Sequence, residues 1–517
     1  MFLDDTIAAI STPPGEGGIG IVRLSGKDAF KIADRLFHSP KGKKISDTPS
    51  HRIIYGFVKD PSTNDTVDEV LVSVMRSPNT YTREDIAEIN CHGGMLPLRK
   101  VLELVIREGA RLAEPGEFTK RAFLNGRLDL SEAEAVIDLI RAKTDESGRI
   151  ALEQLKGRLS EKILKLREAL TQICTFVEAY IDFPEEEIEI SSKKEMMESA
   201  GSILAELESL LKTYEEGRFF REGLGAAIVG RPNVGKSSLL NALLQKDRAI
   251  VTNMPGTTRD IIEEYLNING LPLRIIDTAG IRESHDMAER EGVKRSLRAI
   301  EDADLVIAVV DGSESLKNED FEVLGKIKDK NAIIAINKSD LISPEERKSV
   351  ADRFINKVSF PLPSSAVALL RRMDVGNPSE ERLRAFILRS NATENGSRSD
   401  KSGSNSALTD YASRVIYISA LKEDGLEELK DTIFNSCVKN WKEQKEGIII
   451  TNLRHKIAIQ AAHDSLGNAL RSMETNQPLE ITAIDLREAL DRLGEIVGAV
   501  TTDDILNRIF SDFCIGK

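Results

Sequence analysis

The segment Gly230–Ser237 reads G-R-P-N-V-G-K-S and fits the phosphate-binding pattern G-x-x-x-x-G-K-[ST]. Glycines let such a loop curl until its backbone N–H groups point at phosphate oxygens, and the next helix N-terminus adds partial positive charge. Lys236 can reach the β- and γ-phosphates, and Ser237 can ligate Mg²⁺. The apolar run Gly225–Val229 predicts a strand before the loop, and Ser238–Leu244 predicts a helix after it. The segment therefore predicts a nucleoside triphosphate site and leaves the base open.

Three more short motifs follow, each directly after an apolar run that predicts a strand. In Asp277–Gly280 (D-T-A-G) the carboxylate can hold Mg²⁺ through water, and the glycine lets an N–H approach the γ-phosphate. In Asn337–Asp340 (N-K-S-D) Asp340 can accept hydrogen bonds from guanine N1–H and N2–H₂, a donor pair that adenine lacks. Backbone in Ser419–Leu421 (S-A-L) can meet the guanine O6. Together the motifs predict GTP, and this region resembles the translation-factor-like class of GTPases.

The segment between the loop and Asp277 predicts a two-state switch. Gly256–Asp260 reads G-T-T-R-D, and by position Thr258 would ligate Mg²⁺ only when the γ-phosphate is present; an ordinary polar turn is the alternative. The expected GTP-contacting residues are Asn233, Val234, Gly235, Lys236, Ser237, Ser238, Thr252, Thr257, Thr258, Asp277, Thr278, Ala279, Gly280, Asn337, Lys338, Asp340, Ser419, Ala420 and Leu421.

The residue after D-T-A-G is Ile281, where many GTPases carry a glutamine that positions the attacking water. Because isoleucine cannot hydrogen-bond water, another polar group must orient it. The nearby polar candidates are Arg282, Glu283, Asp286, Glu289 and Arg290.

Composition limits the classes of protein to consider. At 517 residues the chain should hold two to four domains. Its net charge of −13 requires that any nucleic-acid partner be bound through a local patch or a second protein. The four cysteines lie far apart, which argues against a zinc site or a disulfide framework. With no membrane span or signal peptide in the pattern, a cytoplasmic location is expected.

The pattern along the chain predicts a discontinuous helical domain with an inserted α/β domain. Short β-type runs such as Ile19–Leu24 and Glu69–Met75 come first, and apolar residues spaced like one helical stripe follow, from Leu152 to Leu166. Two separate small bundles are the alternative to one interrupted bundle. The expected domains are 1–118, 119–221 (helical), 222–442 (α/β) and 443–517 (helical), and the polar run 390–410 is expected to be disordered.

The chain also resembles the MnmE (TrmE) family of tRNA uridine-modification GTPases nearly from end to end. The segments that carry the resemblance are Asp5–Ile10, Thr12–Gly15, Gly17–Arg23, Pro115–Thr119, Arg121–Leu130 and Phe513–Lys517. The stretch between about 345 and 412 is longer than the family pattern and falls between two guanine-contact motifs.

This resemblance implies a multidomain α+β and α/β fold: an N-terminal folate-binding and dimerisation domain, a discontinuous all-α domain and an inserted P-loop GTPase domain. It implies a homodimer that joins MnmG in a heterotetramer. With GTP, K⁺ and Mg²⁺, and a donor such as 5-formyltetrahydrofolate, the pair would build a (carboxymethyl)aminomethyl group at C5 of the tRNA wobble uridine.

The resemblance also implies roles for single residues. Glu289 takes the position of the catalytic glutamate that orients water. Arg23, Glu84, Arg127 and Lys517 match folate-contacting positions, and Arg127 stands where relatives often carry lysine. The implied K⁺ ligands are the Asn233 side chain, backbone of Thr252 and Met254, and Thr257.

Residue types alone leave weaker interpretations open. The folate positions read as scattered surface charges, Glu289 as a solvated helix carboxylate, and His92 as a turn residue or a ligand. Cys514 could be a nucleophile but has no partnered base nearby in the sequence. At the level of function, a ribosome-assembly GTPase switch and a folate enzyme fused to a switch remain as alternatives.

Overall fold

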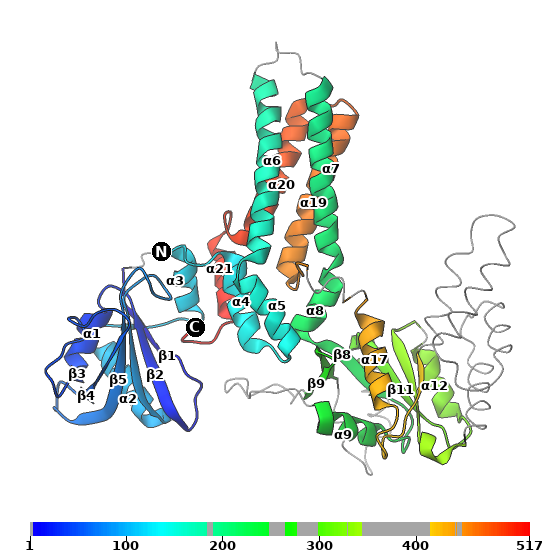
Figure 1. Cartoon of the computed structure of the whole chain (residues 1–517), viewed down its shortest axis with the longest axis horizontal. Helices are drawn as coiled ribbons and strands as arrows, with labels where there is room; N and C mark the ends of the chain where they lie inside the picture. The colour runs from blue at the N-terminus through cyan, green and yellow to red at the C-terminus, as the bar shows by residue number, and fades with distance from the viewer. Residues whose placement is uncertain are drawn as a thin grey trace. The chain divides into compact units, whose positions relative to one another are not determined.

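The computed structural model describes residues 4–182, 190–247, 264–276, 298–327, 329–343, 414–439, 441 and 447–517. Described residues up to Arg221 and from 447 onward form one unit, and those between 222 and 443 form the other. The fold class is the expected one: an α+β N-terminal part, a discontinuous helical part and a P-loop α/β part (Figure 1).

The N-terminal part is a seven-stranded sheet with two helices against one face (Figure 1). Its strand order is β3-β4-β5-β6-β2-β1-β7, antiparallel except for β1 with β7. Its elements are β1 (Ile7–Ile10), β2 (Gly17–Ser25), α1 (Ala29–Leu36), β3 (Phe37–His38), β4 (Arg52–Lys59), β5 (Thr66–Met75), β6 (Ile86–Gly93), α2 (Met95–Arg107), β7 (Arg111–Leu112) and α3 (Glu117–Leu124). The two β-type runs expected from sequence lie in β2 and β5, which confirms them.

Strand residues alternate between the two faces of this sheet. In β5, Val70, Val72 and Val74 are buried against the helices, because successive side chains of a strand point to opposite faces. The other face leaves Ile53, Tyr55 and Leu71 exposed, although all three are large and apolar. Tyr55 and Leu71 are direct cross-strand partners, so the three side chains form one apolar patch.

The helical part is one bundle built from both sides of the insertion. Its elements are α4 (Leu130–Arg141), α5 (Asp145–Leu155), α6 (Arg158–Asp182), α7 (Ile190–Lys212), α8 (Tyr214–Glu222), α19 (Leu453–Glu474), α20 (Leu479–Val497) and α21 (Asp503–Ser511). Helices α6, α7, α19 and α20 lie side by side (Figure 1) and share one core, to which each contributes fully buried side chains. Two separate bundles are thereby excluded.

The single apolar stripe expected from Leu152 to Leu166 is wrong, because the chain breaks between α5 and α6. Gly157 adopts a left-handed φ of +82°, which ends a helix at little cost only for glycine. Leu152 therefore lies on the exposed side of α5, while Leu159, Ile163 and Leu166 enter the bundle core.

A buried charged cluster joins α4 to the second half of the bundle. The Glu134 carboxylate accepts hydrogen bonds from Arg454 Nε (2.9 Å) and Nη2 (2.7 Å) and lies 2.7 Å from His455 Nε2. Arg454 also donates to the backbone oxygens of Glu495 and Ile496 near the end of α20. Burial alone would raise the pKa of Glu134, but His455 and Arg454 hold that pKa at about 2.

We expect Glu134→Gln to destabilise the bundle by about 3–5 kcal/mol at pH 7, because it leaves a buried cation without its anion. The folded-state pKa lies below the unfolded one, so this stabilisation is present above about pH 4.5 and is lost as the pH falls toward 2. Urea unfolding followed by helical circular dichroism at pH 7 and pH 3 measures both effects. Glu206→Gln removes a half-exposed partner of Lys162 and should change little; equal losses in the two variants would contradict the prediction.

The second unit is a six-stranded sheet of order β13-β12-β11-β8-β10-β9. Its described elements are β8 (Leu224–Val229), α9 (Lys236–Asp247), β9 (Glu264–Ile268), β10 (Leu271–Ile275), β11 (Leu305–Asp311), α12 (Asn318–Lys326), β12 (Ala332–Asn337), the 3₁₀ turn η1 (Ser339–Leu341), β13 (Val415–Tyr417) and α17 (Leu426–Cys437). Five strands are mutually parallel, as expected for an α/β sheet, and β9 pairs antiparallel with β10.

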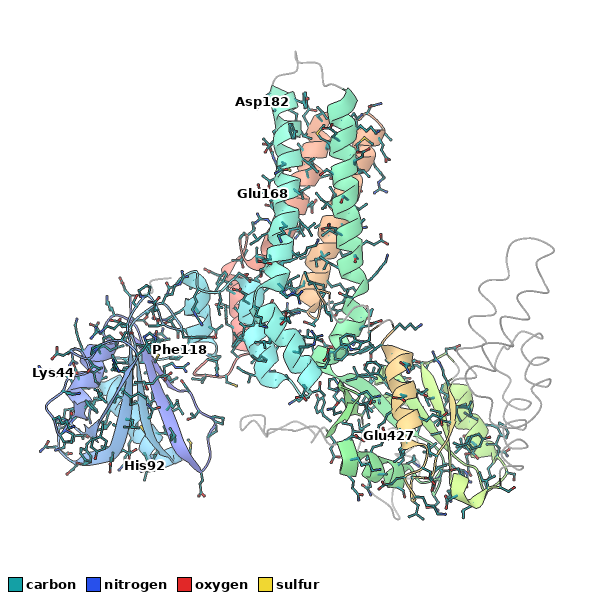
Figure 2. The ribbon with its side chains drawn as sticks, viewed as in Figure 1. Lys44, His92, Phe118, Glu168, Asp182 and Glu427 are labelled. Atoms are coloured by element: carbon teal, nitrogen blue, oxygen red, sulfur yellow. The ribbon has the colours of Figure 1, made fainter. Side chains whose placement is uncertain are left out.

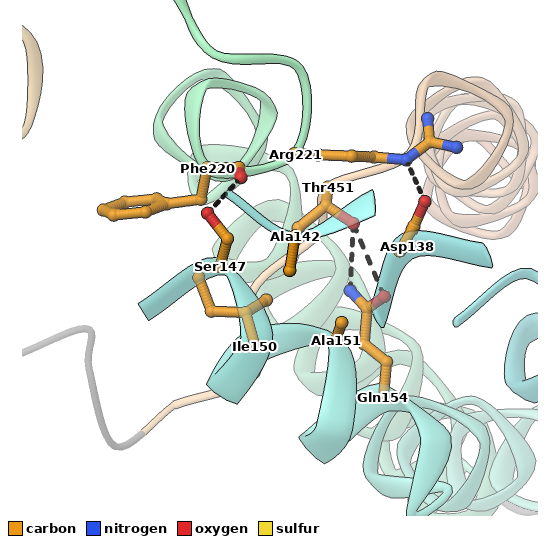
Figure 3. Close-up of a pocket in the computed structure, with 9 residues that line it drawn as sticks. All are labelled: Asp138, Ala142, Ser147, Ile150, Ala151, Gln154, Phe220, Arg221 and Thr451. Atoms are coloured by element: carbon orange, nitrogen blue, oxygen red, sulfur yellow. Dashed lines mark hydrogen bonds and ion pairs between the residues drawn. The ribbon is translucent and has the colours of Figure 1, made fainter. Parts of the chain in front are cut away.

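The chain leaves and re-enters the first unit through segments that are fastened to α4 and α5 (Figure 3). On the outgoing side, Ser147 Oγ donates to the backbone oxygen of Phe220 (2.6 Å), and Arg221 Nε donates to Asp138 (2.8 Å). On the returning side, Gln154 Nε2 donates to Thr451 Oγ1 (3.1 Å) and to the backbone oxygen of Ile449 (3.0 Å). The segment that leaves the first unit and the segment that returns to it are therefore both hydrogen-bonded to the hairpin of α4 and α5.

Candidate functional site

The phosphate-binding loop joins β8 to α9, as its sequence predicts. Lys236 Nζ donates to the backbone oxygens of Gly230 and Arg231, both at 2.9 Å, so the ammonium group lies across the loop. Burial lowers the pKa of Lys236. Gly235 has a φ of +99°, and a Cβ there would lie 2.2 Å from Asn337 Nδ2. Only glycine therefore fits at position 235, where the loop backbone lies against the side chain of Asn337.

Asn337 connects three of the predicted motifs. Its side chain is buried at the end of β12, where Nδ2 donates to the backbone oxygen of Val234 (2.8 Å). Its Oδ1 accepts from the backbone N–H of Ala420 (3.0 Å). Since β8, β12 and β13 run parallel, their carboxyl ends meet at one edge of the sheet, where ligands of such sheets bind.

The expected base-reading residue, Asp340, lies in the 3₁₀ turn after β12. Ser419 Oγ donates to Asp340 Oδ1 (2.7 Å), and this bond holds the pKa of Asp340 below its usual range. Lys338 has a left-handed φ of +62°, and its Nζ lies 2.6 Å from Asp311 Oδ2. Leu421 is exposed, so the last motif can contribute backbone rather than a packed side chain.

Of the four expected folate residues, three cations gather around two aromatic rings of the first unit. Arg23 Cζ lies 5.5 Å from the centre of the Phe118 ring, and Arg127 Cζ lies 4.6 Å from that of Tyr81. Arg23 Nη1 donates to the backbone oxygen of Gly516 (3.4 Å), which brings the last residues of the chain to β2. Burial and the nearby Arg23 lower the pKa of the Lys517 side chain.

Glu84 turns toward a different partner. Its carboxylate accepts from Ser25 Oγ (2.7 Å) and from Arg121 Nη1 (3.1 Å), and Arg121 is fully buried between Glu84, Glu117 and Asp5. Glu84 is thus held by an internal ion-pair network, whereas Arg23 and Arg127 each lie over an aromatic ring and Arg23 also pairs with Glu88 at 2.8 Å.

Comparison with known proteins places this geometry in a family. The family described as "MnmE helical domain" matches residues 130–514, and "GTP-binding protein TrmE N-terminus" matches residues 6–127. The chain belongs to the MnmE family. Proteins named tRNA modification GTPase MnmE from Alkaliphilus oremlandii and Clostridioides difficile are each 44% identical over 517 residues, covering all of both chains.

A member of the MnmE family is a GTP-hydrolysing enzyme associated with tRNA modification, and GTP is its substrate. Among solved structures, one of Era in complex with MgGDPNP and 16S ribosomal RNA nucleotides is 23% identical. It covers 47% of this chain and 66% of that chain, at a TM-score of 0.23. Within the described part of the chain, no helix is both long and apolar enough to cross a bilayer.

Several residues that the nucleotide motifs or the MnmE resemblance single out lie outside the described residues. They are Thr252, Met254, Thr257, Thr258, Asp277, Thr278, Ala279, Gly280 and Glu289. The described candidates on the nucleotide side are Asn233 to Ser238, Asn337, Lys338, Asp340 and Ser419 to Leu421.

Sequence reasoning missed the partners of Arg231, the second residue of the loop. Arg231 is buried, and its guanidinium lies 2.7 Å from Glu314, 3.3 Å from Asp320 and 3.8 Å from Asp311. Asp311 also pairs with Lys338, so one carboxylate at the end of β11 contacts both the loop and the motif that is expected to read the base. The sequence did carry a signal for Asp311, since it ends an apolar run that predicts a strand, just as Asp277 follows one.

The two remaining residues considered for chemistry differ in their surroundings. His92 belongs to strand β6 rather than to a turn, and its Nδ1 lies 2.6 Å from Asp68, whose carboxylate raises the pKa of His92. Cys514 is exposed on the segment after α21. Its backbone oxygen accepts from the N–H of Gly116 (3.3 Å), which ties this segment to the N-terminal part.

Proposed function

We propose that this chain is a K⁺-activated GTPase that, with MnmG, forms the (carboxymethyl)aminomethyl group at C5 of the tRNA wobble uridine from a reduced-folate one-carbon donor. The observation that carries the proposal is the meeting of three guanine-nucleotide motifs at Asn337, in a chain alignable over its full length with tRNA modification GTPases.

The described residues fit GTP and Mg²⁺. Lys236 is partly buried and bonded only to carbonyl oxygens among described groups, so an incoming phosphate offers it a charged partner in place of neutral ones. Asp340 is held ionised by Ser419, the state that accepts both guanine donors. Ser237 stands at the N-terminus of α9 and would supply the Mg²⁺ ligand together with Thr258.

The loop also fits a monovalent cation. Asn233 takes a left-handed φ of +65° and is exposed at the loop. Its amide oxygen is a ligand that K⁺ accepts, and Thr252, Met254 and Thr257 would complete the site. A cation there would neutralise charge that develops between the β- and γ-phosphates. Glu289 would then orient the attacking water in place of Ile281.

The N-terminal cluster fits a reduced folate, which is an anion with an aromatic ring system. Arg23, Arg127 and Lys517 supply positive charge, and Tyr81 and Phe118 supply ring faces. The exposed apolar patch of Ile53, Tyr55 and Leu71 supports a homodimer through the same domain, since such patches mark protein contacts.

Replacing K⁺ with Na⁺ is expected to reduce GTP turnover at least tenfold, because the smaller ion suits the same ligands less well. A second prediction concerns the residue expected to orient the water. Glu289→Ala is expected to reduce turnover in K⁺ by about 10²–10³ and to leave GTP affinity unchanged.

A cell that produces only the Glu289→Ala variant should contain tRNA whose wobble uridine is unmodified, while Glu428→Gln on α17 should behave as wild type. Equal turnover in the two salts, or full modification with Glu289→Ala, would contradict the proposal.

A further inference from the structure

The segment 39–51, between β3 and β4, carries an uncompensated positive charge in an acidic protein. We call residues 39–51 the basic loop. Lys41, Lys43 and Lys44 are exposed on it, Arg52 follows at the start of β4, and Asp47 is its only acidic residue. Figure 2 shows Lys44 at the outer edge of the N-terminal sheet. Among the described residues, none of these three lysines forms an ion pair.

Several other cations of the same domain are neutralised by ion pairs. Lys31 pairs with Asp28 at 2.9 Å, Arg35 with Glu108 at 3.4 Å, and Arg107 with Asp60. Among the described residues of this domain Lys59 and Lys100 also form no ion pair, but only the basic loop brings three such lysines within four positions of the sequence. A chain of net charge −13 repels polyanions through its overall field, so contact with one requires such a local concentration of cations.

The basic loop is held in one conformation by contacts behind the lysines. Ile45 is fully buried in the sheet core, and the Asp34 carboxylate accepts the backbone N–H groups of Ile45 (2.5 Å) and Ser46 (3.1 Å). Arg76 donates to the backbone oxygen of Thr48, and Thr48 Oγ1 donates to the backbone oxygen of Lys44 (2.7 Å). Because the backbone is already ordered, a ligand that binds the lysines costs little loop entropy.

The sheet register relates the basic loop to the cationic cluster at Arg23. Arg23 pairs with Glu88, Glu88 with Ser73, and Ser73 with Ile53, the neighbour of Arg52. These residues form one row across four strands, so the start of β4 lies three strand spacings, roughly 14 Å, from Arg23. The row between them carries Glu88, which pairs with Arg23 at 2.8 Å, and Ile53 of the apolar patch, so the basic loop and the cluster are separate cationic regions of one sheet.

From these observations we infer that the basic loop binds the phosphodiester backbone of tRNA and holds the tRNA while its wobble uridine is modified at another site. The inference rests on the proposed function for the identity of the polyanion. Lysines without aromatic or amide neighbours contact phosphates and carry no base recognition, so the contact is indifferent to sequence. The loop should thus affect tRNA affinity and the KM for tRNA, with kcat unchanged.

The test compares the full-length wild-type chain with K41Q/K43Q/K44Q, using anisotropy of fluorescently labelled tRNA across a range of KCl concentrations. The variant should bind at least tenfold more weakly near 0.15 M salt. Its plot of log affinity against log salt should be shallower by about 2, since each neutralised phosphate contributes roughly 0.7–0.9. K156Q/K194Q/K212Q removes the same charge from ion-paired lysines of the bundle and should retain the wild-type slope.

Equal slopes for the two triple variants would overturn the inference, because the overall field would then explain binding. Loss of binding to vesicles of anionic lipid, with tRNA binding intact, would overturn it in favour of a membrane contact. K⁺-stimulated GTP turnover should be the same in all three proteins. If wobble modification is lost in Glu289→Ala but tRNA affinity is unchanged in K41Q/K43Q/K44Q, the proposed function stands and only this inference is wrong.

Discussion

Asp340→Asn is expected to weaken GTP binding by roughly 10²–10⁴-fold, the largest single change that we predict for affinity. The wild-type carboxylate offers two acceptors to guanine N1–H and N2–H₂. An amide offers one acceptor and one donor, so a donor group would face the guanine amine. Xanthine carries a carbonyl at C2, and the variant should therefore bind xanthosine triphosphate better than GTP.

Affinity of both nucleotides, measured by displacement of a fluorescent analogue, tests this inversion. The Ser419–Asp340 hydrogen bond can persist on the retained oxygen, so loss of folding is not expected to explain the result. Glu428→Gln changes the same functional group on exposed α17 and should leave both affinities unchanged. An Asp340→Asn protein that still prefers GTP would show that Asp340 does not read the base.

Lys236→Met is expected to reduce GTP turnover by about 10²–10³, because it removes the ammonium group that lies across the loop, where the phosphates of GTP are expected to bind. Methionine keeps most of the volume of the aliphatic chain, so packing of α9 should survive. The two backbone oxygens now bonded to Lys236 would lose their partner, which adds a modest cost in stability.

Turnover at saturating GTP, divided by the fraction of the protein that is folded, separates the two effects, since a purely structural defect lowers the active fraction and leaves turnover per active site unchanged. Lys246→Met on the same helix removes an exposed lysine paired with Glu423 and provides the matched control. If Lys236→Met hydrolysed GTP within tenfold of wild type, the loop would not act as a phosphate site.

Local signals in the sequence were sufficient for the GTP motifs and for the strands that precede them. Each GTP motif that the structure describes follows the strand expected for it, because apolar run, turn and polar residue are contiguous. The hairpin β9–β10 carried such a signal too: Asn269 and Gly270, both left-handed, form the two-residue turn that joins its strands. The break at Gly157 was missed because leucine spacing continued across it.

Partners that are distant in the chain could not be predicted in this way. Arg231 meets carboxylates about 80 residues further on, and Glu84 meets Arg121, which no pattern around Glu84 indicates. The cationic cluster depends on residues near 517 reaching β2. Side chains of this kind are placed by tertiary packing, and the sequence offered only their charge and, for Arg23 and Lys517, a family resemblance.

The fastening of both chain crossings to α4 and α5 has an evolutionary consequence. Ile450 N–H donates to Thr213 Oγ1 (3.0 Å), and Gly217 packs directly against the backbone oxygen of Ile450, so the two cut ends of the first unit lie side by side. A segment inserted between them starts and ends at neighbouring points, and each doubling of the length of a flexible insertion costs only about 0.6 kcal/mol in closure entropy. A longer inserted segment, such as the one expected between residues 345 and 412, is therefore compatible with an unchanged helical bundle.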